Sequence, residues 1–410
     1  MISSEDLIFA SFLRLKEFCE KENFKGWDPF DGLNSKIFSK VPILYNNRTA
    51  RLLWIQFFKR SSLNFRKMLK VEKGYNPKGL GLFLNGYCNL YRVRPDVDVL
   101  NQIHFLANKL IVLQTKGYSG SCWGYNFDWQ ARAFYQPKFT PTVVATSFIA
   151  SALFDAYEVT GEILYLETAI SSGDFILKDL NRTYGKGGTF CFSYSPKDRS
   201  QVFNASLLGS KLLGRIYTYT QDKNILEDAM LSINYCCEAQ NEDGSWSYGN
   251  LPFHQWIDNF HTGFNLEALC SFQRYTGIFD FDVNIEKGLN YYLNTFFTDE
   301  GVPKYFNNKT YPVDIHSSAQ LIMTLASAGK FDEKIQIVKK VLKWTIGNMQ
   351  DKQGFFYYQF RKSFTNKIPY MRWAQSWMFY AMSVYFLNCE SSSGSSLTKE
   401  VMDKVRLFAN

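Results

Sequence analysis

The sequence predicts an all-α fold in which helical hairpins with aromatic-rich loops close into an (α/α)6 ring. The main observation is a repeat of inner helix, outer helix and glycine-aromatic loop, whose copies begin 55 to 64 residues apart. The copies begin near Pro77, Pro141, Val202, Phe260, Ile315 and Arg372. Because a ring of helix pairs gathers one end of every inner helix around a common funnel, we expect the loops at that end to carry the function.

The repeat predicts a single structural unit despite the length of the chain. A chain of 410 residues usually contains two or three domains, but this repeat occupies most of the chain, so we predict one structural domain. Residues 1–76 are predicted as N-terminal helices that pack on the ring. A first helix is expected from Ser4 to about Lys21, followed by a turn-rich stretch at 26–35 and a second helix from Arg48 to Lys70.

Residues 77–388 are predicted to form the ring itself. The first inner helix is expected from Pro77 to about Tyr91, and its outer helix from Val97 to Leu113. A long loop at 117–142, rich in glycine, proline and aromatic residues, separates them from the next inner helix.

Glycines mark the ends of two inner helices. Thr160-Gly161 and Thr276-Gly277 supply the C-terminal glycine at which a helix stops and reverses. The closing helix is expected from Arg372 to Asn388, and residues 389–410 are predicted as a flexible linker and a short C-terminal helix.

The composition deviates in its aromatic content. Phe, Tyr and Trp make up 17% of the chain, and many of these rings lie in the loops that follow the outer helices. They are either wedges between hairpins or platforms for a sugar ring or an isoprenoid chain. The net charge of +8 is dispersed, which usually indicates a solvated surface but would also attract an anionic polymer or a phosphate group. Without a helix-turn-helix, zinc-finger or RNP pattern, we predict no nucleic-acid partner.

Cysteine usage and the terminal sequence indicate a compartment. The eight cysteines form no CxxC pair and lie mostly in helical apolar patterns, which favours free thiols in a reducing environment. The N-terminal residues are acidic where a secretory signal requires a basic region, and no apolar run is long enough to span a bilayer. We therefore expect a cytoplasmic protein without a membrane span, and leave its oligomeric state open.

Several segments resemble known helical toroids. Gln240-Asn-Glu-Asp-Gly-Ser-Trp246 resembles the Gln-Trp motif of terpene cyclases, and the hairpin size resembles that of six-hairpin glycosidases. Asn204-Ala-Ser-Leu-Leu with Tyr217 is similar to the inner-helix pattern of glucuronyl C5-epimerases. These resemblances imply the toroid fold over about residues 77–388 more strongly than any one activity.

A bacterial group gives a further resemblance. The segments 26–35, 76–80 and 124–130 resemble little-characterised toroid proteins associated with surface-polysaccharide synthesis. This resemblance implies a role in polysaccharide biosynthesis, on an oligosaccharide, a polysaccharide or a lipid-linked sugar.

The sequence lacks the motifs of several classes of toroid enzyme. Neither Asp-rich motif of the terpene cyclases is evident, and Asp96-Val-Asp98 reads more simply as a helix cap. The adjacent Cys236 and Cys237 have no histidine nearby, so we predict no zinc site, and no nucleotide or nicotinamide fingerprint is present. We accordingly predict neither a metal nor a cofactor, and an isoprenoid enzyme is the least favoured class.

Histidines near inner-helix starts are the first candidates for chemistry. His261 and His316 each follow an aspartate, Asp258 and Asp314, by two or three residues, and His254 lies in the loop before them. A histidine shuttles protons near neutral pH, which suits an acid or a base. The alternative is that the aspartates only cap helices and the histidines only bond neighbouring loops.

The long loop and the chain's last repeat supply further candidates. Asp128 and Arg132 combine a carboxylate with a guanidinium suited to a substrate carboxylate, or they pair with each other to fix the loop. The predicted catalytic residues are His261, His316, Asp128, Asp258 and Tyr194. The predicted substrate contacts are Arg132, Arg372, Trp123, Tyr125, Asn126, Trp129, Trp246, His254, Trp256, Asp314 and Trp373.

The hypothesis that follows is a carbohydrate-active enzyme for an anionic or uronic-acid-containing glycan or its precursor. Epimerisation and elimination need a base, a proton donor such as Tyr194, and a cation on the uronate carboxylate. Hydrolysis needs two carboxylates instead, drawn from Asp128, Asp258 and Asp314. A non-catalytic glycan-binding or scaffold subunit with the same funnel is the alternative.

Overall fold

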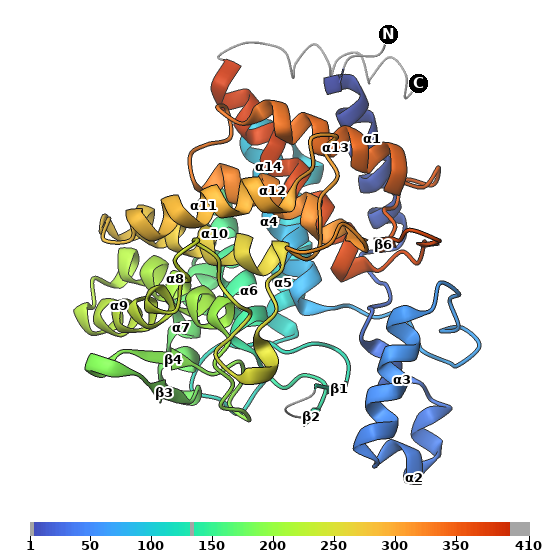
Figure 1. Ribbon diagram of the computed structural model, residues 1–410, viewed down its shortest axis with the longest axis horizontal. Helices are drawn as coiled ribbons and strands as arrows, with labels where there is room; N and C mark the ends of the chain where they lie inside the picture. The colour runs from blue at the N-terminus through green and yellow to red at the C-terminus, as the bar shows by residue number, and fades with distance from the viewer. Residues whose placement is uncertain (1–3, 132–134, 394–410) are drawn as a thin grey trace.

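The computed structural model describes residues 4–131 and 135–393, and most of them form a ring of helix pairs (Figure 1). Each inner helix contacts the next, and the last contacts the first, which closes the ring and confirms the predicted fold. The inner helices are α4 (Pro77–Val93), α6 (Val143–Thr160), α8 (Phe203–Thr220), α10 (Asn259–Thr276), α12 (Ile315–Ser327) and α14 (Ser376–Ser393).

The outer helices alternate with the inner ones along the chain. They are α5 (Val97–Val112), α7 (Ile163–Asp174), α9 (Lys223–Glu238), α11 (Asp282–Phe296) and α13 (Ile335–Met349). The sixth outer position is filled by α1 (Ser4–Lys21), which packs against α13 and α14. The ring therefore draws its last outer helix from the N-terminal segment, which lies before the predicted boundary at residue 77.

Local signals begin and end the inner helices where the sequence suggested. The side chains of Asn76, Thr142, Asp258 and Asp314 accept hydrogen bonds from the first turns of their helices. Gly161 ends α6 with a φ of 74°, and Gly277 ends α10 with a φ of 73°. Inner helices are buried almost all round because neighbours cover both faces, whereas the outer helices expose one face.

Short strand pairs, which the sequence analysis did not predict, stiffen the loops. They are β1 (Trp129–Gln130) with β2 (Tyr135–Gln136), β3 (Arg182–Tyr184) with β4 (Phe190–Phe192), and β5 (Val313–Asp314) with β6 (Gln359–Phe360) and β7 (Thr365–Asn366). All three sheets are antiparallel. Because β5 runs directly into α12, its sheet lies at the N-terminal end of the inner helices.

Residues 27–71 form an arm that projects from the ring at the lower right of Figure 1. It contains the short helices η1 (Asp31–Asn34), η2 (Phe38–Lys40) and α2 (Pro42–Tyr45), and the longer α3 (Arg48–Arg60). The predicted helix from Arg48 to Lys70 was thus too long by ten residues.

A buried arginine explains the early end of α3. The Arg66 guanidinium donates to Asp31 Oδ1 at 2.8 Å, to the Asp28 carbonyl at 2.7 Å and to the Tyr370 hydroxyl at 3.0 Å. Satisfying this buried cation requires the chain to turn back towards the ring after Arg60, and tertiary contacts override local helix propensity.

Two remaining predictions concern the last helix and the membrane. A π-helical turn, η6 (Met371–Gln375), precedes α14, which continues to Ser393, so residues 389–393 are helical and not a linker. The predicted C-terminal helix falls on residues outside the described chain. Among the described helices, α6 alone is long and apolar enough to cross a bilayer, and it is a mostly buried inner helix of the ring.

Candidate functional site

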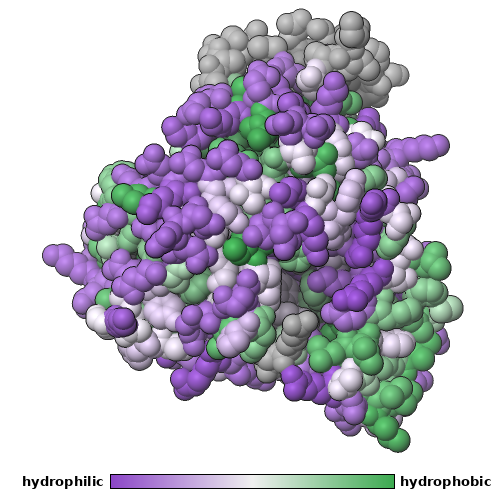
Figure 2. All heavy atoms as spheres, in the orientation of Figure 1, coloured by the Kyte–Doolittle hydropathy of each residue, from purple (hydrophilic) through white to green (hydrophobic). Residues whose placement is uncertain are grey.

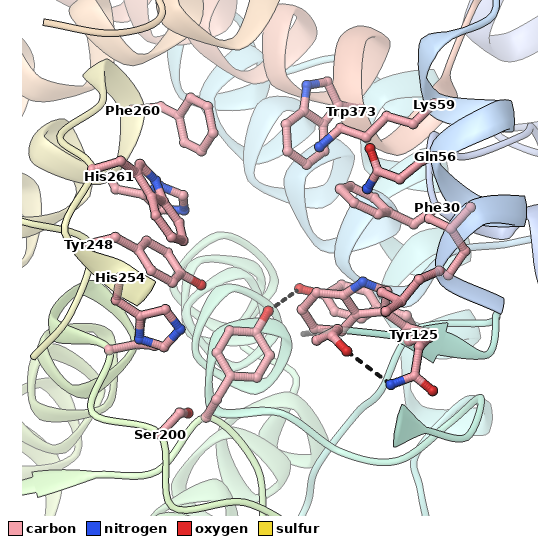
Figure 3. Close-up of a pocket in the computed structure, with 18 of the residues that line it drawn as sticks. Phe30, Gln56, Lys59, Tyr125, Ser200, Tyr248, His254, Phe260, His261 and Trp373 are labelled. Atoms are coloured by element: carbon pink, nitrogen blue, oxygen red, sulfur yellow. Dashed lines mark hydrogen bonds between the residues drawn. The ribbon is translucent and has the colours of Figure 1, made fainter. Parts of the chain in front are cut away.

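A cavity of about 580 Å³ lies between the arm and the N-terminal ends of the inner helices (Figure 3). This volume falls within the range of roughly 300–1,000 Å³ that is usual for small-molecule sites. Of the 24 residues that line it, twelve are Phe, Tyr or Trp. The funnel predicted from the repeat therefore exists, and its walls are aromatic.

Stacked ring pairs build the walls. Tyr248 and Trp256 lie parallel, with centroids 4.5 Å apart and an interplanar angle of 15°, and Tyr125 stacks on Phe127 at 5.3 Å. Figure 3 shows Tyr248 on the wall opposite Tyr125. Flat aromatic faces on two sides suit a ligand with apolar faces and a polar rim, which describes a sugar ring.

Phenol groups add polar atoms to these walls. The hydroxyls of Tyr125 and Tyr194 lie 3.2 Å apart, and burial raises the pKa of both phenols. The loop that carries Tyr194 is fixed by Asp198, whose carboxylate accepts from the backbone N–H of Ser195 at 2.7 Å. Both phenols therefore stay protonated near neutral pH and can donate a hydrogen bond to a ligand.

His261 is the best-positioned base on the cavity wall. Its Nδ1 lies 2.7 Å from Asp258 Oδ2, and its side chain is 22% exposed, on the side that lines the cavity. The same Asp258 oxygen accepts from the indole N–H of Trp256 at 3.0 Å. Since a carboxylate can only accept, Nδ1 carries the ring proton, and Nε2 is left as an acceptor.

Asp258 is held in place by the helix that it caps. Its Oδ1 accepts from the backbone N–H of His261 at 3.0 Å, at the first turn of α10. The carboxylate is fully buried, so it lies behind the imidazole and not on the cavity wall. The predicted cap is therefore present, and the same aspartate also contacts the histidine ring.

His254 shares this wall. It lies 5.1 Å from the Tyr248 ring and is nearly buried, and its Nδ1 has no hydrogen-bond partner among the described residues. Burial lowers its pKa, which keeps the ring neutral near pH 7. The unpartnered Nδ1 is itself buried, so the ring lines the cavity without presenting that nitrogen to it.

His316 lies one layer deeper and does not line the cavity. Its ring stacks on Phe260 at 4.4 Å and on Trp377 at 4.1 Å, and neither ring nitrogen has a partner within the described residues. Burial, followed by the charges of Lys78, His261 and Arg372, holds its pKa well below the usual value.

Asp314 also lies behind the wall. It caps α12 through the backbone N–H of His316 at 3.1 Å and accepts from the indole of Trp373 at 2.9 Å and from Gln359 at 2.8 Å. Its contribution to the cavity is therefore to hold Trp373, whose ring forms part of the lining.

Cations approach the cavity from both sides. Arg372 lines it but is paired with Asp28 through two bonds of 2.5 and 2.8 Å. Lys59, from α3, extends its amine into the cavity 4.6 Å from the Phe30 ring, and burial lowers its pKa. Arg60 completes this basic side. An anionic group in the cavity would meet the Lys59 amine, which forms no salt bridge within the described residues, although Asp314 and Asp258 lie close enough to act on its charge.

The cavity lining lacks carboxylates. Among its residues, all of which lie in the described part of the chain, none is Asp or Glu. Nor does any group of three or more His, Cys, Asp or Glu side chains in that part suit a metal ion. The three aspartates predicted for hydrolysis, at 128, 258 and 314, all lie off the wall.

Several predicted contacts serve to hold loops together. The indoles of Trp123 and Trp246 are buried and donate to the carbonyls of Leu110 and Cys236 in the outer helices before them. These two rings are wedges. The predicted site residues that do line the cavity are Tyr194 and His261, predicted as catalytic, and Tyr125, Trp129, His254, Trp256, Arg372 and Trp373, predicted as substrate contacts.

The long loop is pinned to the arm. Asp128 accepts from the hydroxyl of Tyr45 at 2.6 Å and from the backbone N–H of Lys138 at 2.8 Å, and Asn126 accepts from Asn76 at 2.8 Å. Neither side chain lines the cavity. The prediction for Arg132 falls on a residue outside the described chain.

Sequence reasoning missed the contribution of the arm. Leu52, Ile55, Gln56 and Lys59 form one face of α3 and line the cavity opposite His261. The sequence did contain a signal for this contact. Apolar residues occur on more than one face of α3, whereas a helix that packs on one side only has a single apolar face.

Comparisons with solved structures agree on the fold. The chain is similar to a sugar epimerase from a ruminal bacterium, at 11% identity over 78% of this chain and 90% of that chain, with a TM-score of 0.58. It is also similar to a cellobiose 2-epimerase from Bacillus thermoamylovorans (14%, 77% and 88%, TM-score 0.60) and to an unsaturated glucuronyl hydrolase specific for heparin (12%, 78% and 88%, TM-score 0.57). No family model and no curated protein sequence matches the chain. The fold is thus an (α/α)6 toroid.

Proposed function

We propose that the cavity binds an anionic, uronic-acid-containing glycan or glycan precursor and removes a proton from it, in an epimerase-type or lyase-type reaction. The observation that carries this proposal is the His261–Asp258 pair on the wall of an aromatic and basic cavity. A histidine with a fixed tautomer provides a base at Nε2, and the cavity offers rings for stacking and cations for a carboxylate.

The chemistry follows from the arrangement of these groups. The proton on the carbon beside a uronate carboxylate becomes acidic when positive charge stabilises the enolate that forms, and Lys59 supplies such charge. Nε2 of His261 takes this proton. In an epimerase, a proton donor on the opposite face then restores the C–H bond with inverted configuration, and Tyr125 lies across the cavity from His261 (Figure 3).

The same geometry argues against hydrolysis. Glycosidases place two carboxyl groups on either side of the scissile bond, about 5–10 Å apart. No carboxylate lines the described cavity, whereas a base, phenols and cations do. Two of the similar structures are epimerases and a third is a glucuronyl hydrolase, which supports a sugar as ligand without selecting the reaction.

A wider role in polysaccharide assembly belongs to this proposal as well. It is supported by the resemblance of segments 26–35, 76–80 and 124–130 to toroid proteins of surface-polysaccharide synthesis. A glycan carried on a lipid is one form that such a precursor takes.

Solvent deuterium exchange tests the reaction. The protein is incubated in heavy water with uronic-acid oligosaccharides of different backbones, and NMR follows deuterium at the carbon beside the carboxylate. Unsaturated products would identify a lyase. We expect exchange with wild-type protein and a loss of roughly 10²- to 10⁴-fold in His261→Gln.

His104→Gln is the matched control. His104 lies on α5, away from the cavity, with its Nδ1 2.9 Å from the Tyr165 hydroxyl, so this variant should retain exchange. Binding without exchange in the wild-type protein, and equal binding in His261→Gln, would replace the proposal by a non-catalytic glycan-binding role. No binding of any uronic-acid oligosaccharide would refute both.

A further inference from the structure

The arm carries the largest concentration of exposed apolar side chains on the described chain. Of 21 large apolar residues that are exposed, eight fall within 32 consecutive residues of the arm, with exposed fractions from 42% to 86%. We define them as the apolar patch: Ile37, Val41, Ile43, Leu44, Leu53, Phe57, Leu63 and Met68. Figure 2 shows them as a green area over α2 and α3, at the lower right.

The patch is a rigid surface. An aromatic ladder ties its segments together, since Phe38 stacks on Trp54 at 4.6 Å, Trp54 contacts Phe57, and Phe57 stacks on Phe65 at 5.3 Å. Below it, buried Arg66, which is paired with Asp31 inside the arm, donates to the Tyr370 hydroxyl at 3.0 Å and so ties the arm to the ring. Continuous apolar surfaces of this kind usually mark an interaction site.

The charge around the patch is mainly positive, although Lys36 is paired with Glu72 and Asp128 accepts from Tyr45. From Lys36 to Lys70 the chain contains nine Lys and Arg residues and no Asp or Glu. The loop between β6 and β7, which is joined to the arm by a 2.8 Å bond from Asn366 to the Ser61 carbonyl, adds further basic residues. The exposed basic side chains are Lys36, Lys40, Arg48, Arg60, Lys67 and Lys70 on the arm, Lys362 in the loop, and Lys367 just after β7.

This charge selects among possible partners. A second copy of the chain that docked through the same face would bring two positive rims together, and such like-charge contact is unfavourable. An anionic lipid bilayer satisfies both features, because its acyl boundary accepts the apolar side chains and its headgroups attract Lys and Arg.

We propose that the arm docks on an anionic membrane surface through the apolar patch, with the basic side chains in the headgroup layer. One helix then serves two surfaces, because Leu52 and Ile55 of α3 face the cavity while Leu53 and Phe57 face outward. Docking therefore brings the cavity to the bilayer surface, where it meets lipid-linked sugars, a consequence that rests on the proposed function.

Vesicle sedimentation without any glycan tests the docking itself. We expect the full-length protein to bind vesicles of equal parts phosphatidylcholine and phosphatidylglycerol, and to bind pure phosphatidylcholine vesicles at least about tenfold more weakly. Added salt should weaken the binding, because it screens the basic residues. The double variant Ile43→Glu/Leu53→Glu should lose at least about tenfold in binding.

The matched control uses two apolar residues at the ends of an outer helix. Val97 and Val112 on α5 are 69% and 77% exposed, so Val97→Glu/Val112→Glu adds the same charge to equally exposed sites and should bind vesicles like the wild type. Thermal unfolding of both double variants verifies that they fold. Their deuterium exchange on a soluble glycan should match the wild type, which separates this proposal from the proposed function.

Three results would overturn the docking. The wild type could fail to bind anionic vesicles, or the patch variant could bind as well as the control. Alternatively, sedimentation could show a wild-type dimer that the patch variant dissociates, with no vesicle binding, in which case a second copy is the partner.

Discussion

Asparagine at position 258 would keep the shape of the aspartate side chain while turning one of its two acceptors into a donor. The cap on α10 survives, because Asn caps helices about as well as Asp. The NH2 group of the asparagine, however, takes the place of Oδ2. It then faces the indole N–H of Trp256 and Nδ1 of His261, which both donate to Asp258 in the wild type. The indole N–H can only donate, so it would face another donor without a hydrogen bond. We therefore expect a loss of about 1–3 kcal/mol in the free energy of unfolding.

The imidazole can adapt, and that adaptation removes the base. If Nδ1 must accept from the new amide, the ring proton moves to Nε2, the nitrogen assigned to proton abstraction. We expect the exchange rate to fall by roughly 10²- to 10⁴-fold, with little change in glycan binding. Long-range nitrogen–proton NMR spectra of histidine-labelled protein would report the change of tautomer directly, and urea unfolding would give the stability.

Asp314→Asn is the matched control because Asp314 has the same structural roles as Asp258 but its side chain does not bond a histidine ring. It caps α12, is buried and accepts from an indole, that of Trp373. Its variant should lose similar stability but keep the His261 tautomer and most of the exchange. Exchange at the wild-type rate in Asp258→Asn, or an equal loss in both variants, would refute the assignment of His261 as an oriented base.

Other predictions concern pH, charge and helix ends. His316 stays neutral in the folded protein because burial lowers its pKa, but it becomes protonated in the unfolded chain below about pH 6.5. The proton therefore favours the unfolded chain, and the free energy of unfolding should fall by about 1.4 kcal/mol per pH unit below that pH. His316→Phe keeps the stacked ring and should remove that part of the slope in urea unfolding. Lys59→Gln should weaken binding of a uronate oligosaccharide by about tenfold in calorimetry and leave a neutral analogue unchanged. Gly161→Ala, at a φ of 74°, should cost about 1 kcal/mol, whereas Gly347→Ala in α13, where a Cβ meets nothing within 4 Å, should stabilise slightly.

The ring was predictable because each of its elements has a local signal. Apolar residues at helical spacing mark the inner helices, and Gly161 and Gly277 mark two of their ends through a backbone conformation that glycine adopts at no steric cost. The arm had no such signal. Its course after Arg60 depends on Arg66 reaching Tyr370, more than 300 residues away, and no local pattern contains that contact.

The aromatic residues show why the site was only partly predictable. Trp246 and Tyr248 belong to one glycine-aromatic loop, yet Trp246 is a wedge and Tyr248 forms the cavity wall. The difference is that the Trp246 indole donates to a carbonyl in the last turn of α9, as the Trp123 indole does in α5. In these two loops the first tryptophan therefore packs on the outer helix, and rings that follow it in the sequence reach the cavity.

Spacing also explains why two similar Asp–His motifs have different outcomes. His261 is the third residue of α10, the position whose side chain reaches back to the N-cap, so its ring bonds Asp258 at the helix end. His316 is the second residue of α12, and one residue turns a side chain by about 100° around the helix axis. The His316 imidazole consequently points into the interior of the toroid, between Phe260 and Trp377. Burial there keeps the imidazole neutral. A difference of one residue between cap and histidine thus separates a base on the cavity wall from a buried packing group.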